Sequence, residues 1–249
     1  MALPAGLLGA ALLLGAVLAA PPPPARAHVI LEPQVVERLL ADIGRFRQQS
    51  REGDTEEGRL EALYQMGESV RGLVELMDRD VGAHGAGDLF GQLIAKRLRE
   101  HGLGVAFTEE THRYRYDFAA FHEYLRRAPR GTRAIEIRYR LIADAFYRTL
   151  SPDSPAMLRG SAEELLPALE QAEGFLRDFP NDPRAKEVRL FRATDYYRLS
   201  RSARDATTAR RYAELARKAL RELVARHGGT PEARAAEGLL ERLEGAPGD

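Results

Sequence analysis

The sequence predicts an all-α protein, a solenoid of antiparallel helix pairs with an atypical helical part at its N-terminus. Three observations predict it. Apolar residues recur at spacings of three and four along most of the 249 residues, which is the period of an amphipathic helix. Corners rich in Pro and Gly separate these segments. One such corner occurs three times in the second half, and a recurring helix–turn–helix is typical of units that bury their apolar faces against one another.

The first 27 residues have the pattern of an export signal. Residues 3–20 are almost wholly Leu, Ala, Gly and Val, four prolines follow, and Ala25-Arg26-Ala27 is the small-x-small site that signal peptidase cleaves. We expect residues 1–27 to be removed, so that the mature chain begins at His28 in the periplasm or is secreted. A membrane-anchored adaptor with an uncleaved helix is the alternative, because no Lys or Arg precedes the apolar run and its length is near the minimum of about 17 residues that spans a bilayer.

Composition excludes several classes of protein. The chain has no cysteine, so it has no disulfide, no thiolate metal site, no catalytic thiol and no cysteine for a lipid anchor. Its 37 Lys and Arg balance 37 Asp and Glu, and a general nucleic-acid binder would carry a basic excess. We therefore expect no nucleic-acid partner, no lipid anchor and no cofactor.

Residues 28–104 form the N-terminal helical part. A helix is expected over residues 34–48, followed by a polar turn and a second helix that Thr55 caps and that ends near Met77. The Gly and Ala steps of residues 78–88 predict a loop, and a short helix over residues 89–99 follows. Residues 105–116 mix Thr and Tyr with charged residues, which predicts a short hairpin or an ordered loop as the connector to the repeats.

From residue 117 to residue 249 the pattern is helical. One helix ends at the Pro129 corner, and the next ones are expected over residues 132–149, 161–178, 183–199, 205–227 and 231–243. Ser161 with a Glu three residues later is a capping box. Asp182 before Pro183, and Thr230 before Pro231, each predict an N-cap followed by proline in the first helical position.

The repeated corner carries a small residue at one position. The copies run over residues 124–134, 175–185 and 223–233, and their structural residues are Pro129 and Ala134, then Pro180, Pro183 and Ala185, then Pro231 and Ala233. The three alanines lie 51 and 48 residues apart (134 to 185, 185 to 233). We expect the small residue to admit the preceding helix closely while a neighbouring aromatic or leucine fills the remaining space.

The second corner, Phe179-Pro180-Asn181-Asp182-Pro183-Arg184-Ala185, resembles the F-P-x-S-P-x-A turn of exported bacterial tetratricopeptide-like proteins. Examples are the helical lipoprotein of the outer-membrane β-barrel assembly machine and the periplasmic coordinator of cell division. The resemblance covers about residues 117–243. Upstream of it, Glu61 and Tyr64 have the same residue types and spacing as Glu136 and Tyr139. The resemblance implies a tetratricopeptide-like scaffold or adaptor that binds a protein or peptide in envelope assembly or cell-wall processes. The chain lacks the lipidated Cys of the assembly lipoprotein, and it carries Gly131 and Asp182 where the family frequently has Ser.

Tyrosine and arginine are the candidate binding residues, because both types are typical anchors at protein interfaces. The candidates for a partner-binding groove are Tyr139, Tyr147, Arg138, Arg192, Tyr196 and Tyr197. The alternative for each tyrosine is packing between helices with its hydroxyl at the edge. The chain has neither a G-x-S-x-G nor an H-E-x-x-H motif, so we expect no enzyme.

A second hypothesis is an exported copper-binding or enzymatic protein that uses His28. After cleavage, the terminal amine and imidazole of His28 are nitrogen ligands of the kind that copper favours. The other five histidines are scattered without an i,i+4 pair, so the sequence indicates no further ligands.

The first testable prediction concerns processing. Edman sequencing of the exported protein should read His-Val-Ile-Leu, and a bulky Ala27→Gln substitution at the cleavage site should block processing because the site requires small residues. An exported protein that retains Met1 would contradict the cleaved signal and favour the anchored adaptor.

Overall fold

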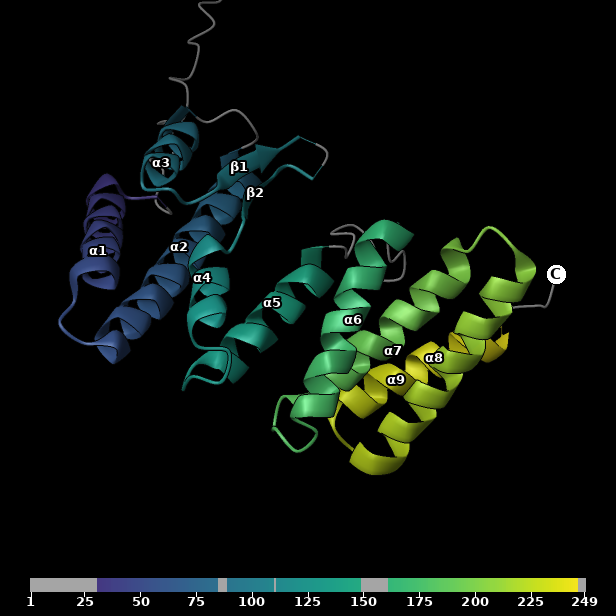
Figure 1. The fold of residues 1–249 in the computed structure, drawn as a ribbon. Coiled ribbons are helices and arrows are strands. Elements are labelled where there is room, and N and C mark those ends of the chain that lie inside the picture. The colour runs from purple at the N-terminus through teal and green to yellow at the C-terminus, as the bar shows by residue number, and fades with distance from the viewer. Residues whose placement is uncertain (1–30, 85–88, 110, 149–160, 246–249) are drawn as a thin grey trace, which may run out of the picture.

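The structure is a computed structural model that describes residues 31–84, 89–109, 111–148 and 161–245. Within these ranges the chain folds into nine helices and one antiparallel hairpin (Figure 1). The elements are α1 (Pro33–Glu52), α2 (Glu56–His84), α3 (Leu89–Glu100), β1 (Val105–Thr108), β2 (Arg113–Tyr116), α4 (Ala119–Arg127), α5 (Ala134–Arg148), α6 (Ala162–Asp178), α7 (Ala185–Ser202), α8 (Ala206–His227) and α9 (Pro231–Gly245). The predicted all-α solenoid is confirmed. No helix in the described ranges is long and apolar enough to cross a membrane.

The helices stack as consecutive pairs. Helices α1 and α2, α4 and α5, α6 and α7, and α8 and α9 form the pairs, and α2 also packs against α4, α5 against α6 and α7 against α8 (Figure 1). The second helices of successive pairs touch as well, α5 against α7 and α7 against α9. Helix α3 and the hairpin are inserted in the chain between α2 and α4. This pattern is a solenoid of four units whose first unit carries an insert.

Local capping explains where several helices begin. The Ser161 capping box is present in full, with the Ser161 hydroxyl accepting from the backbone of Glu164. The Thr55 hydroxyl accepts a hydrogen bond from the backbone N–H of Gly58 at 3.0 Å, and the Thr230 hydroxyl accepts one from the backbone N–H of Ala233 at 3.2 Å. Each cap satisfies a backbone N–H that has no partner inside the helix, so these predicted starts are confirmed.

Three local predictions were wrong. Helix α5 begins at Ala134 rather than at residue 132, where the chain is still in the turn. The loop expected over residues 78–88 is helical as far as His84, because Met77 and Val81 continue the buried apolar stripe of α2 and tertiary packing outweighs the weak propensity of Gly. Helix α7 begins at Ala185 rather than at Pro183. The carboxylate of Asp182 accepts from the backbone of Arg184 at 2.9 Å and therefore closes the corner instead of capping the helix.

The insert forms the short hairpin that residues 105–116 predict. Val105 pairs with Tyr116, and Thr108 with Arg113. Val105 and Tyr116 are buried, and the backbone N–H of Tyr114 donates to a carboxylate oxygen of Asp78 on α2 at 2.6 Å. The hairpin is thus attached to the long helix of the first unit.

The first two repeated corners have the same backbone geometry. In each, three backbone hydrogen bonds at matching positions close the turn. In the first corner, Ala128 donates to Tyr124 at 2.8 Å, Gly131 to Ala128 at 3.0 Å and Ala134 to Gly131 at 2.9 Å. In the second, Phe179 donates to Phe175 at 2.8 Å, Asp182 to Phe179 at 3.2 Å and Ala185 to Asp182 at 2.9 Å. An arginine nine residues after the corner proline donates to its carbonyl in both copies, Arg138 at 3.3 Å and Arg189 at 2.8 Å. The third copy departs, with α8 running on to His227 and a positive φ at Gly229.

The departure from Ser in the first corner has a steric cause. A Cβ atom on Gly131 would lie 2.7 Å from the hydroxyl of Tyr124, which itself accepts from the backbone N–H of Arg133. The second corner has Phe175 in place of Tyr124, without a hydroxyl, and carries a full side chain at Asp182. The hydroxyl of Tyr124 therefore crowds any side chain at position 131, whereas the second corner has no such hydroxyl and carries the side chain of Asp182.

The small residues after the corners lie where the sequence predicts. Ala134, Ala185 and Ala233 are at most 1% exposed, and all three lie in helices. Ala134 shares a core with Tyr124, and Ala185 shares one with Phe175. The first of these cores extends from Leu31 to Ile137, so the apolar interior continues across the connector at residues 105–116.

Two glycines of α2 test how closely α2 and α4 pack. A Cβ on Gly67 would lie 2.2 Å from the buried ring of Phe121 on α4, whereas one on Gly72 would meet nothing within 4 Å. We expect Gly67→Ala to lower the free energy of unfolding by about 1–3 kcal/mol through overpacking, and Gly72→Ala to raise it by up to about 1 kcal/mol through helix propensity. Urea unfolding measures both, and equal effects of the two substitutions would contradict the described packing.

Candidate partner-binding surface

Tyrosine, arginine and glutamate connect consecutive units in a repeated arrangement. The guanidinium of Arg133 lies 4.6 Å from the ring centroid of Tyr64, and that of Arg184 lies 5.6 Å from the ring of Tyr139. In each case the arginine comes from the unit that follows the tyrosine. A cation over an aromatic face is stabilising. Tyr64 and Tyr139 therefore occupy equivalent positions in successive units, as the similarity between Glu61–Tyr64 and Glu136–Tyr139 predicts. The candidate residue Tyr139 is thus used in a contact between units.

The carboxylate of Glu187 lies between two of the candidate tyrosines. The hydroxyl of Tyr139 donates to one oxygen of Glu187, and the hydroxyl of Tyr147 donates to the other at 3.2 Å. Burial and the negative charge of Glu187 raise the pKa of both hydroxyls. Tyr147 keeps half of its surface exposed, although its ring edge packs on Phe191.

Tyr196 joins α7 to α6. Its hydroxyl donates to the carboxylate of Glu173, and its ring stacks on Tyr212 of α8 with centroids 6.4 Å apart. Burial first, and Glu173 second, raise the pKa of Tyr196 to about 12. Tyr197 is half-buried, and its hydroxyl makes no hydrogen bond to another described residue.

The two candidate arginines differ in their contacts. Arg138 donates a hydrogen bond to the carbonyl of Pro129, and its guanidinium lies 3.7 Å from the carboxylate of Asp178. Its contacts therefore stabilise the first repeated corner and link it to the end of α6. Arg192 is half-buried, and none of the described residues offers it a hydrogen bond or an ion pair. Arg192 and Tyr197 are therefore the two candidates that the fold leaves available.

Arg192 belongs to a cluster of positive charges, Arg189, Arg192 and Arg226, that the sequence analysis did not identify. Burial, and then the charges of Arg226 and Arg192, lower the pKa of Arg189, while Glu222 opposes the shift. Arg189 and Arg192 are three residues apart on α7 and share a face of that helix. Arg226 comes from α8, and packing of α7 against α8 brings the third charge to this face.

A pocket of about 320 Å³ lies between α1 and α4, here called the α1–α4 pocket. It is lined by Arg47, Ser50, Arg51, Leu63, Met66, His101, Gly102, Leu103, Ala119, Ala120, Glu123 and Arg127. These residues come from α1, α2, the turn after α3 and α4, so the pocket exists only in the folded first two units. None of its residues was a candidate from the sequence, because no local pattern joins positions that far apart in the chain.

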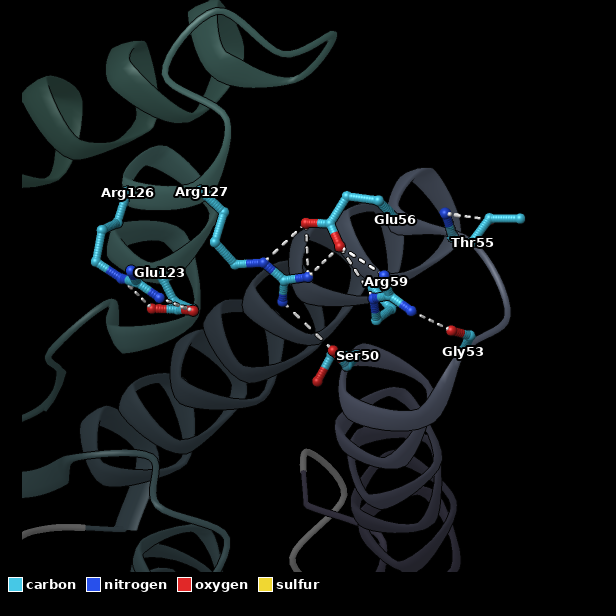
Figure 2. Close-up of polar contacts among 9 residues, drawn as sticks. Ser50, Gly53, Thr55, Glu56, Arg59, Glu123, Arg126 and Arg127 are labelled. Atoms are coloured by element: carbon cyan, nitrogen blue, oxygen red, sulfur yellow. Dashed lines mark hydrogen bonds and ion pairs between the residues drawn. The ribbon is translucent and has the colours of Figure 1, made fainter.

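Arg127 and Ser50 of this pocket belong to a network of charge-assisted hydrogen bonds that extends beyond it (Figure 2). Arg127 donates to both carboxylate oxygens of Glu56, at 2.7 Å each, and to the carbonyl of Ser50 at 3.4 Å. Arg59 also donates to Glu56, at 3.0 Å, and donates to the carbonyl of Gly53 at 2.6 Å. The network ties α4 to the turn between α1 and α2, and a bidentate arginine holds that geometry better than a single point charge does.

In the described ranges, no group of three or more His, Asp or Glu side chains is placed to hold a metal ion. His28 lies outside the described residues.

No protein-family model and no curated protein matches the chain. Among solved structures, the crystal structure of a de novo designed helical repeat protein matches with 18% sequence identity and a TM-score of 0.20. The match covers 85% of this chain and 96% of the designed one. A TM-score of that size transfers no detail of geometry, so the solenoid rests on the helix pairing described above.

The tyrosine contacts predict a selective change in tyrosine titration. Glu187→Gln should lower the pKa of Tyr139 and Tyr147 together, because it removes the negative charge that both hydroxyls face. Glu173→Gln is the matched control and should lower the pKa of Tyr196 alone. NMR titration with tyrosine labelled at ¹³Cζ reports each hydroxyl separately.

The same contacts set a direction for stability at high pH. The pKa of Tyr196 is raised from 10.0 to about 12, so the stability linked to its neutral form is complete below pH 10 and is lost as the pH rises through about 12. Tyrosines that all titrate together near pH 10 in the folded protein would contradict these contacts.

Proposed function

We propose that the chain is a scaffold that binds a segment of a protein partner on its stacked helices, in the periplasm or outside the cell. The observation that carries the proposal is the cluster of Arg189, Arg192 and Arg226. Arg189 and Arg192 share a face of α7, α7 packs against α8, and the charge of Arg226 on α8 acts with that of Arg192 to lower the pKa of Arg189, while Glu222 opposes the shift.

The cluster supports binding because the fold itself makes little use of its charge. Arg189 donates to the carbonyl of Pro180, but Arg192 and Arg226 have no ion pair with any residue that the structure describes. Arginines held close together repel one another, and an approaching negative group relieves that repulsion. Arginine is also among the residue types enriched at the energetic centres of interfaces.

The mechanism of such a scaffold is positional. Packing fixes the helices, and hydrogen bonds fix several side chains at their edges, so a partner meets a surface that is already ordered. Binding to a preorganised surface loses less conformational entropy than binding to a flexible one. No chemical step is part of this function, and we propose no enzymatic activity.

The setting of this function rests on the sequence. The export signal of residues 1–27 supports a periplasmic or secreted location. The resemblance of the repeated corners to exported bacterial tetratricopeptide-like proteins supports a role in envelope assembly or cell-wall processes.

A crosslinking pull-down from envelope fractions tests the proposal. The tagged mature protein should capture a specific partner, and the double variant Arg192→Gln/Arg226→Gln should reduce its yield at least about fivefold, since a charged interface contact contributes on the order of 1–3 kcal/mol. Arg201→Gln is the matched control, because Arg201 is exposed on the same helix and lies outside the cluster. Neither arginine of the double variant has a described hydrogen-bond partner, so its helicity should stay unchanged.

Two results would overturn the scaffold. One is an envelope fraction from which wild type and double variant capture nothing specific. The other is turnover of a small molecule by the purified protein, which would favour an enzyme instead.

A further inference from the structure

The α1–α4 pocket lies at a defined place in the stack. Helices α1 and α4 are the first helices of two consecutive units, and α2, which packs against both, lies between them. The turn at the end of α3 closes one side with Leu103. The pocket is therefore built by the junction of two units together with the insert of the first.

The floor of the pocket is apolar. Leu63 and Met66 of α2, Leu103 and Ala120 each line the pocket, and each is at most 6% exposed as a residue. A methionine in such a floor adapts its shape to different apolar groups. The floor accordingly suits an aliphatic side chain more than a polar one.

The rim of the pocket carries positive charge that none of the described carboxylates neutralises. The Arg47 guanidinium lies within hydrogen-bond distance of the carbonyl of Glu100 and of Nδ1 of His101, each at 3.4 Å, and neither group is a carboxylate. Arg51 has no ion pair or hydrogen bond with a described residue. Two guanidinium groups on the rim are thus without a carboxylate.

The other charges of the rim are already paired. Arg127 is satisfied by Glu56, and the Glu123 carboxylate accepts two hydrogen bonds from Arg126 at 2.7 and 2.8 Å (Figure 2). The net surplus at the pocket is therefore positive and lies on Arg47 and Arg51. A rim of this kind attracts a carboxylate, and arginine matches a carboxylate with two parallel N–H groups.

We propose that the α1–α4 pocket binds an acidic side chain next to an aliphatic side chain of a protein partner. The aliphatic group lies on Leu63 and Met66, and the carboxylate lies between Arg47 and Arg51. The volume of about 320 Å³ is at the lower end of the range for ligand pockets, roughly 300–1,000 Å³, and suits a short peptide motif. This inference rests on the scaffold function and names the chemistry of the partner at a second place on the molecule.

The test uses the mature full-length protein and three blocked heptapeptides. The first has Leu-Glu-Leu at its centre, the second replaces Glu by Gln, and the third replaces both Leu by Ser. With ¹⁵N-labelled protein, the first peptide should shift the backbone amides of Gly102 and Ala120 in a saturable way. The other two peptides should bind at least about fivefold more weakly, because each loses either the charge or the apolar contact.

Protein variants locate the carboxylate. Arg47→Gln/Arg51→Gln should weaken binding of the Leu-Glu-Leu peptide about tenfold and reduce its dependence on salt, since two charged contacts are lost. Arg38→Gln is the matched control, an exposed arginine of the same helix that lies outside the pocket. Binding that is unchanged in the double variant, or shifts that avoid the pocket residues, would overturn the proposal.

The pull-down variants separate this proposal from the scaffold. A natural partner that wild type and Arg47→Gln/Arg51→Gln capture equally well, while Arg192→Gln/Arg226→Gln does not, would leave the scaffold standing and reject the pocket as a partner site. A scaffold that fails in the pull-down while the Leu-Glu-Leu peptide still binds in the pocket would reject a protein partner in that fraction and keep the ligand chemistry.

Discussion

The packing of helices beside a buried alanine in each of the second, third and fourth units is the constraint on which the repeat depends. Ala134, Ala185 and Ala233 are at most 1% exposed, and a tightly packed interior accepts added volume only by distortion. The same three-bond corner in two copies aims the second helix so that its alanine arrives there. The contacts of Tyr64 with Arg133 and of Tyr139 with Arg184 then join consecutive units beside these corners.

Much of the fold could be predicted because its signals are local. A cap and a corner need only a few consecutive residues, and the Ser161 capping box, the Thr55 and Thr230 caps and the hairpin near Tyr116 are all in the structure. The end of α2 could not be predicted, because its last turns are held by tertiary packing. Likewise Asp182 satisfies the corner rather than the helix, and a sequence pattern does not distinguish those two uses of an aspartate.

The candidate site was harder to predict because the sequence does not show which charged side chains the fold places next to one another. Tyr139, Tyr147, Tyr196 and Arg138 were candidates for a groove, and neighbouring helices supply carboxylates to each of them. Arg192 has no such partner, although its sequence context is similar. Burial of the Asp195–Arg198 ion pair, 3.1 Å apart in the same helix, is equally invisible in the sequence, and burial raises the pKa of Asp195 to about 6 while Arg198 opposes the shift. Whether an arginine or tyrosine is used by the fold or is available to a partner depends on whether folding places a carboxylate beside it, and the residue type alone does not show this.

The two different corners have a consequence for how this chain can change over time. Tyr124 accompanies a glycine seven residues later, and Phe175 accompanies an aspartate at the matching position. Recombination between the two units that copied only one member of a pair would place a Cβ against a phenolic oxygen, or leave glycine where a carboxylate braces the backbone. The aromatic position and the position seven residues later are therefore expected to vary together. Homologous chains should combine Tyr with Gly, or Phe with a larger residue, more often than Tyr with a larger residue or Phe with Gly.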